Sequence, residues 1–181
     1  MPSAPRSKPP RLPDNSVDPE GEFPLGAPEY FFYLLFQTAR QRDLHFDRIL
    51  EPSGLNIAQW RSMAIIRRLE VCTMSSLARY STVERTTLTR AVDQLVRRGV
   101  VRRWTPEHDR RQVNLSLTTE GEAIYRKAVA VLKDLNAALL ADVDPDRLRD
   151  LARLLQVVLH RLTGTDSLAM DLLTFGRTTP P

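Results

Sequence analysis

Arginines and threonines gather in one short part of the sequence, and their chemistry suits a nucleic acid. Between residues 85 and 111, eight arginines stand against three acidic residues, a local charge of +5 in a chain whose total is +4. A guanidinium can bind phosphate or guanine through paired hydrogen bonds, and a threonine offers a hydroxyl and a methyl to base edges. The residues expected on the exposed face of one helix are Arg85, Thr86, Thr87, Thr89 and Arg90.

A charged turn follows this helix. Residues 105–111 read Thr-Pro-Glu-His-Asp-Arg-Arg and separate two short alternating segments, 100–104 and 112–117, which predicts a β-hairpin. Asp109 stands two residues before Arg111, so its carboxylate can hold a guanidinium in a fixed direction. An arginine held in this way can enter a narrow minor groove, where the negative potential is concentrated.

Further arginines surround this turn. Arg110 lies at its tip, Arg97 and Arg98 close the preceding helix, and Arg102 and Arg103 lie in the first strand. We expect Arg97 and Arg98 to contact phosphates, which is binding without sequence preference. An arginine-rich amphipathic helix with a solvated face would be the alternative for the helix alone. The arginines in the strands favour a nucleic-acid surface, because a plain charged turn does not need them.

Other functional classes find little support in the sequence. It contains no glycine-rich phosphate loop and no Ser/His/Asp or Cys/His grouping at an informative spacing, so we predict neither an enzyme nor a cofactor. A single cysteine, Cys72, excludes an intrachain disulfide framework, and three scattered histidines exclude a Cys/His zinc cluster within one chain. No metal site is therefore expected.

Composition also predicts a compartment. No run of 18 uncharged apolar residues is present, which argues against a membrane span, and the N-terminus lacks the apolar stretch of a secretory signal. The lone cysteine fits a reducing environment. We expect a cytoplasmic protein that does not bind membranes.

Periodicity predicts the helices that must position the arginines. Apolar residues recur at three- and four-residue steps over 29–50, which indicates a first helix. Asn56 and Gln59 have the spacing of a capping box at the start of a second helix, and Thr73 can cap a short third helix. Thr82 occupies the turn position where many helix-turn-helix motifs have glycine, and a fourth helix then runs to about Arg98.

The second half of the chain adds the hairpin and two further helices. The fifth helix begins at Thr118 or Thr119 and runs through Leu140, and Asp144-Pro145 opens a sixth that ends at Gly164. The apolar stripe of the sixth helix contains Leu148, Leu151, Leu155, Val158 and Leu162. The predicted fold is mainly α. The aromatic face of the first helix and this stripe together form more apolar surface than one chain of this size can easily bury, which predicts a dimer.

Several segments of the sequence, taken together with their order and spacing, resemble the MarR family, the multiple-antibiotic-resistance type of bacterial regulator. The resemblance covers about residues 30–163. The matching segments are Asn56–Arg61, Ser76–Arg79, Thr86–Leu95, Arg98–Val101 and Asp109–Gly121.

This resemblance implies a winged helix-turn-helix with a two-stranded wing, in a sequence-specific transcriptional regulator, most commonly a repressor. Its partners would be a second copy, bound through the first, fifth and sixth helices, and double-stranded DNA carrying a near-palindromic operator. By the same resemblance, Arg111 enters the minor groove and Asp109 orients it.

The domain organisation expected from the sequence follows from these assignments. Residues 1–26 are a proline-rich, disordered tail, 27–164 one domain, and 165–181 a second tail. Within the domain, helices 29–50 and 119–163 serve dimerisation, and residues 56–118 form the winged helix-turn-helix.

The resemblance also implies an effector, usually a small ligand or an oxidant. We expect an aromatic carboxylate, or its coenzyme A thioester, in a pocket where the first two helices meet the winged domain. Its candidate apolar lining is Tyr30, Phe31, Tyr33, Phe36, Trp60 and Met63, and its candidate carboxylate partners are Arg40, His45 and Arg61. Two alternatives remain: a ligand-independent DNA-binding or architectural protein, whose aromatic residues are core, and a thiol-oxidation sensor acting through Cys72.

Overall fold

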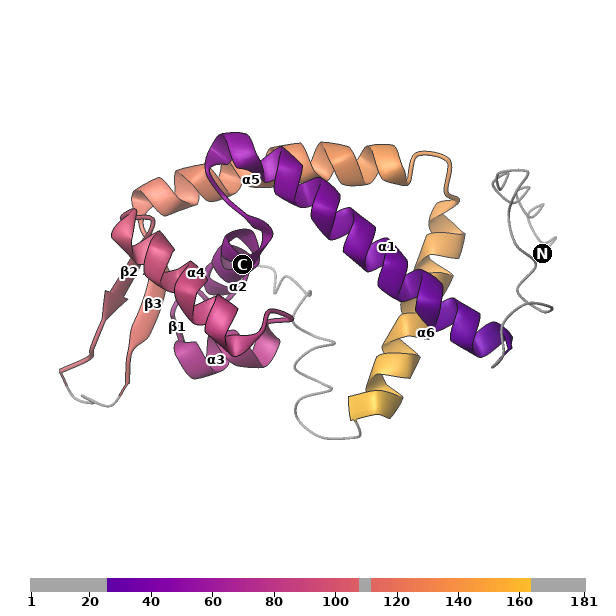
Figure 1. Cartoon of the computed structure of the whole chain (residues 1–181), viewed down its shortest axis with the longest axis horizontal. Coiled ribbons are helices and arrows are strands. Elements are labelled where there is room, and N and C mark those ends of the chain that lie inside the picture. The colour runs from indigo at the N-terminus through magenta and orange to yellow at the C-terminus, as the bar shows by residue number, and fades with distance from the viewer. Residues whose placement is uncertain (1–25, 108–111, 164–181) are drawn as a thin grey trace, which may run out of the picture. The chain divides into compact units, whose positions relative to one another are not determined.

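The computed structural model describes residues 26–107 and 112–163 of the chain. It divides into two compact units: a central unit of residues 33–136, and a terminal unit formed by the segments on either side. Figure 1 shows the elements in chain order. They are α1 (Ala27–Leu50), the 3-10 helix η1 (Glu51–Ser53), α2 (Ile57–Leu69), β1 (Cys72–Thr73), α3 (Met74–Tyr80), α4 (Arg85–Arg97), β2 (Val101–Trp104), β3 (Asn114–Leu117), α5 (Thr119–Leu139) and α6 (Pro145–Thr163). Apart from Gly26, the two predicted tails lie outside the described residues.

Side-chain caps begin α2 and α3 where the sequence predicts them. The Asn56 carboxamide oxygen accepts the N–H of Gln59 at 2.9 Å, and the Gln59 side-chain oxygen accepts the N–H of Asn56 at 3.0 Å. The predicted capping box is therefore confirmed. Thr73 caps α3 in the same way, because its hydroxyl accepts the N–H of Ser76 at 3.0 Å.

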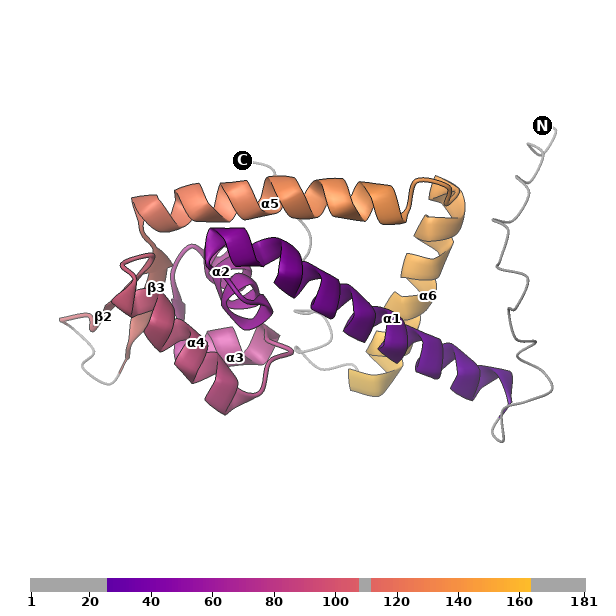
Figure 2. The ribbon, with the colours of Figure 1, turned by 45° about the horizontal axis from the view of Figure 1, so that its top comes forward.

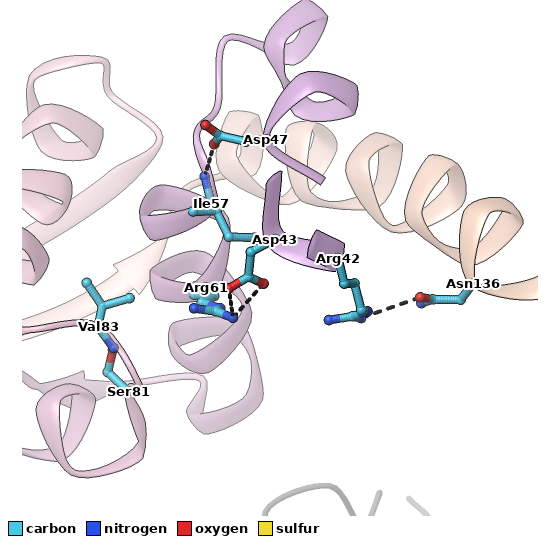
Figure 3. A network of polar contacts seen from close by, with 8 residues as sticks. All are labelled: Arg42, Asp43, Asp47, Ile57, Arg61, Ser81, Val83 and Asn136. Atoms are coloured by element: carbon cyan, nitrogen blue, oxygen red, sulfur yellow. Dashed lines mark hydrogen bonds and ion pairs between the residues drawn. The ribbon is translucent and has the colours of Figure 1, made fainter. Parts of the chain in front are cut away.

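The turn between α3 and α4 closes without glycine. The Ser81 hydroxyl accepts the N–H of Val83 at 3.0 Å, a side-chain turn that replaces a left-handed backbone (Figure 3). Among the described non-glycine residues, only Glu70 has a positive φ. Thr82 thus fits this turn without backbone strain.

The wing belongs to a larger sheet than the sequence indicates. In the described part of the chain the strands form one antiparallel sheet of three, in the order β1-β3-β2. The predicted hairpin is β2 with β3, in a register that runs from Val101 opposite Leu117 to Trp104 opposite Asn114. The prediction of two strands missed β1, because a strand of two residues carries no alternation that a sequence could display.

A hydrophobic core lies under α4 in the central unit, where Figure 2 shows α2, α3 and α4 gathered beside the sheet. The core residues of α4 are Leu88, Ala91, Val92 and Leu95, those of α2 include Met63, Ile65 and Ile66, and Leu77 and Leu115 come from α3 and β3. Burying one side of α4 turns its other side to solvent.

The base of the wing is fixed by a close approach at the start of α5. A Cβ on Gly121 would lie only 2.0 Å from the carbonyl oxygen of Val100, so this buried position has room only for glycine. The Thr118 hydroxyl donates to the Gly99 carbonyl at 2.8 Å and accepts the N–H of Gly121 at 3.0 Å. These contacts anchor both ends of the hairpin.

The terminal unit contains α6, which begins as predicted. The Asp144 carboxylate accepts the N–H of Asp146 at 2.8 Å, and Pro145 occupies the first helical position. The whole of α6 is described, and it buries none of its residues. Leu151 and Leu162 of its apolar stripe are 45% and 75% exposed, so the described residues leave much of the stripe uncovered. Across the described segments, no helix combines the length and apolar character needed to cross a membrane.

Candidate nucleic-acid interface

The polar face of α4 carries the predicted DNA-reading residues. Arg85, Thr86, Thr87, Thr89 and Arg90 are all exposed, and Leu88 between them is fully buried. The first turns of α4 thus expose these five polar side chains on the side of the helix that faces away from the core. Such a surface can offer hydroxyl and guanidinium groups to base edges or phosphates.

An ion pair connects this helix to the wing. The Arg103 guanidinium lies 2.8 Å from the Asp93 carboxylate, and both side chains are only partly exposed. Arg103 therefore holds β2 against α4. Arg102 and Trp104 lie two residues apart on the other face of β2, where the guanidinium sits 4.7 Å from the centre of the indole ring.

The tip of the wing carries three of the predicted DNA contacts, Asp109, Arg110 and Arg111, which lie outside the described residues. Their roles stay predictions. The strands that precede and follow them are described, and their ends pair across the sheet at Trp104 and Asn114.

The two arginines at the end of α4 differ in their contacts. Arg97 is exposed, as predicted for a phosphate contact. Arg98 is also exposed, but its guanidinium donates to the carbonyl oxygen of Gly54 and, at 3.4 Å, to that of Ser53. Gly54 has a φ of 64° and ends η1. Arg98 thus ties α4 to the turn after α1, and its contact with phosphate stays a prediction.

One charged residue of this surface was not predicted from the sequence. Glu84 is the N-cap of α4, and its carboxylate accepts the N–H groups of Thr86 at 2.8 Å and Thr87 at 3.1 Å. These backbone hydrogen bonds lower the pKa of Glu84 below its usual value. In the sequence, this cap is indicated by a carboxylate directly before the helix, although Ser, Thr, Asp and Asn are the commoner N-cap residues.

A surface hollow of about 360 Å³ lies between α1 and α2 in the central unit. It is lined by Phe36, Ala39, Arg40, Asp43, Leu44, Asp47 and Ile57. Figure 3 shows two of its polar groups in use: the Asp47 carboxylate accepts the N–H of Ile57 at 2.7 Å, and Asp43 faces Arg61. Of the predicted ligand-binding residues, the structure brings Phe36 and Arg40 together here.

The other predicted ligand-binding residues are placed elsewhere. Arg61 is paired with Asp43, at 2.7 and 2.8 Å from its two oxygens, so it is not free for a ligand carboxylate. Trp60 stacks on Tyr125 of α5, with ring centres 5.2 Å apart, and Met63 is fully buried. None of the three lines the hollow: Met63 is a core residue, and Arg61 and the half-buried Trp60 contact other side chains of the protein. Their assignment to a ligand stays a prediction.

The remaining candidates of α1 lie outside the hollow as well. Tyr33 and His45 are exposed but do not line it. Tyr30 and Phe31 belong to the terminal unit.

Comparison with known proteins decides the family. A model described as "MarR family" matches residues 55–113. The chain is 30% identical over 127 residues to the multiple antibiotic resistance protein MarR of Escherichia coli K12, an alignment that covers 70% of the chain and 88% of that protein. The chain belongs to the MarR family. It is thus a DNA-binding transcriptional regulator with a winged helix-turn-helix, as the resemblance implied.

Other MarR-family relatives are similar over comparable lengths. The homoprotocatechuate degradative operon repressor of E. coli is 27% identical over 122 residues, covering 67% of the chain and 82% of that protein. The structure of a cysteine-to-serine variant of E. coli MarR with operator DNA matches at a TM-score of 0.65 and 29% identity, covering 72% of the chain and 94% of that one. A MarR-family regulator from Silicibacter pomeroyi matches at a TM-score of 0.69 and 26% identity, covering 82% and 99%.

The one cysteine of this MarR-family chain has the environment of a core residue. Cys72 is 5% exposed, and burial raises the pKa of its thiol from 9.0 to about 11. Both features slow oxidation, because the thiolate is the reactive form and reagents need access to it. The structure therefore gives no support to an oxidation sensor.

We predict that the Cys72 thiol of the folded protein reacts slowly with an aromatic disulfide reagent at pH 8. The raised pKa lowers the thiolate fraction about a hundredfold relative to the unfolded chain, and burial slows the reaction further. The release of the coloured thiol, followed with and without denaturant, measures both rates. Equal rates in the two conditions would contradict the assignment.

Proposed function

We propose that the chain represses transcription as a homodimer, with α4 of each copy in the major groove of a near-palindromic operator and each wing in the adjoining minor groove. It acts by binding DNA rather than by catalysing a reaction. The observation that carries the proposal is the exposed face of α4, where Arg85 and Arg90 flank three threonines above a fully buried core. A helix with this surface suits the major groove, where every base pair presents a distinct pattern.

The wing supports the same arrangement. The ion pair between Arg103 and Asp93 holds β2 beside α4, so the hairpin and the helix can contact DNA together. Between Trp104 and Asn114 the tip carries Asp109, Arg110 and Arg111, which suits the negative potential of a narrow minor groove. Arg97 adds a contact to phosphate.

Dimerisation is supported by apolar residues that the described part of the chain leaves exposed. In α6 these include Leu148, Leu151, Leu154, Val157 and Leu162, all between 37% and 75% exposed. Leu139 and Leu140, at the end of α5, are exposed too. Apolar surface of this extent marks an interaction site. A second copy fits best, because a two-fold dimer matches the symmetry of a palindromic operator.

We predict that Arg111→Ala weakens binding to the operator by about 1–3 kcal/mol, the usual value of a good groove contact. A duplex that the wild-type protein selects from a random pool serves as the operator, and gel shifts at one salt concentration measure the affinity. Arg149→Ala is the control, since this exposed arginine pairs with Asp146 on α6. An unchanged affinity for Arg111→Ala would rule out the proposed wing contact.

We predict that Leu151→Glu weakens the dimer at least tenfold, roughly 1.4 kcal/mol or more, because it places an unpaired charge in the apolar surface. Sedimentation measures the dissociation constant, and circular dichroism checks that the helices persist. Gln156→Glu adds the same charge at an exposed polar position of α6 and should leave the dimer intact. Equal dissociation constants for the two variants would contradict an interface at this stripe.

We further propose that an aromatic carboxylate, or its coenzyme A thioester, releases the repressor from DNA by binding in the α1–α2 hollow. Its volume, about 360 Å³, falls in the range of roughly 300–1,000 Å³ common for small-molecule sites. Phe36, Leu44 and Ile57 provide apolar contacts, and Arg40 provides a cation for the carboxylate. The relative that represses a homoprotocatechuate degradative operon makes homoprotocatechuate a suitable first compound to test.

We predict that one member of a panel of homoprotocatechuate, hydroxybenzoates, cinnamates and their thioesters raises the melting temperature and releases the selected duplex. Arg40→Ala should weaken that effect about tenfold or more, the value of a charge-assisted hydrogen bond. His45→Ala, on the same helix but outside the hollow, is the control. If no compound acts, the ligand-independent DNA-binding protein is the better account.

A further inference from the structure

The N-terminus of α4 is closed by a negative charge. The Glu84 carboxylate accepts the N–H groups of both Thr86 and Thr87, which are two of the amides that a helix leaves without an internal partner. Glu84 itself is exposed, and the neighbouring Arg85 and Arg90 are exposed on the same helix. The charge therefore stands on the surface proposed to approach DNA.

An open helix N-terminus attracts phosphate, since its free amides and its dipole both favour an anion. That attraction is independent of sequence, because every nucleotide carries the same phosphate. In this chain the two amides are already occupied, and the carboxylate repels a phosphate that approaches them. A neutral cap such as serine would satisfy the same amides without this repulsion.

Base edges present a different partner to the same carboxylate. An ionised carboxylate only accepts hydrogen bonds, and the donors in the major groove are the amino groups of cytosine and adenine. In a DNA sequence that places such an amino group near the N-terminus of α4, a hydrogen bond to Glu84 can offset the repulsion between its carboxylate and the phosphates. Arbitrary DNA, held mainly through its phosphates, cannot offset it to the same extent.

We propose that Glu84 is a specificity-determining residue, whose charge at the N-terminus of α4 weakens binding to arbitrary DNA more than binding to the operator. This inference rests on the proposed function, in which the N-terminal part of α4 enters the major groove. It gives the cap a role in discrimination beyond its role in starting the helix.

The test separates the charge of Glu84 from its capping. Glu84→Gln and Glu84→Ser remove the charge and keep an oxygen that can cap, whereas Glu84→Asp keeps both. Glu120→Gln is the matched control, because it removes one charge from the exposed first turn of α5. Fluorescence anisotropy measures the affinity of the full chain for the selected duplex and for a scrambled duplex of the same composition.

Both neutral variants should bind the scrambled duplex about fivefold more tightly for each copy in contact, the effect of one unit charge close to a phosphate in water. Their affinity for the selected duplex should rise less or fall, so the ratio of the two affinities decreases. Glu84→Asp and Glu120→Gln should keep the wild-type ratio.

Two results would overturn the inference in distinguishable ways. If the wild-type protein selects a sequence but Glu84→Gln and Glu84→Ser keep the wild-type ratio, Glu84 is only a cap and the proposed function stands. If the wild-type protein selects no sequence, the proposed function fails together with the inference.

Discussion

The burial of one side of α4 determines the direction of every side chain that this helix can offer to DNA. Leu88, Val92 and Leu95 are completely buried, and truncating one such leucine to alanine typically costs about 2–5 kcal/mol. Because they cannot leave the core, the threonines and arginines between them must face solvent. Gln59 adds a polar constraint, since its amide donates to Gln94 of α4 at 2.8 Å while its oxygen caps α2. The helix proposed to read DNA is thus held by both packing and hydrogen bonds.

Five of the described arginines near this surface fall into two groups. Arg103 and Arg98 contact the protein itself, Asp93 and the turn at Gly54 respectively, and they fix the wing and the end of α4. Arg85, Arg90 and Arg97 extend from α4 into solvent. A partly exposed ion pair contributes only about 0–1 kcal/mol to stability. The value of the Arg103 pair therefore lies in orienting the hairpin.

Local patterns in the sequence predicted much of the fold, and distant partners account for what they missed. The capping box of Asn56 and Gln59, the hairpin of β2 with β3 and the outward face of α4 depend on residues close in the chain. Pairing of Cys72 with Leu115, and of Arg61 with Asp43, joins residues far apart in the chain, which periodicity cannot reveal. The stripe of α6 was predicted to lie uncovered, and in the described part of the chain Leu148, Leu151 and Leu162 are exposed. That outcome fits an element whose partner is another copy.

Chemical footprinting on the selected duplex tests most directly whether α4 and the wing read DNA together as a dimer. We expect protection of guanine N7 in two major grooves about one helical turn, roughly 10 base pairs, apart, with protected minor-groove positions beside each. The pattern should be symmetric about the centre of the site, because two identical copies produce it. Protection of one groove only, or uniform weak protection along the duplex, would contradict the account.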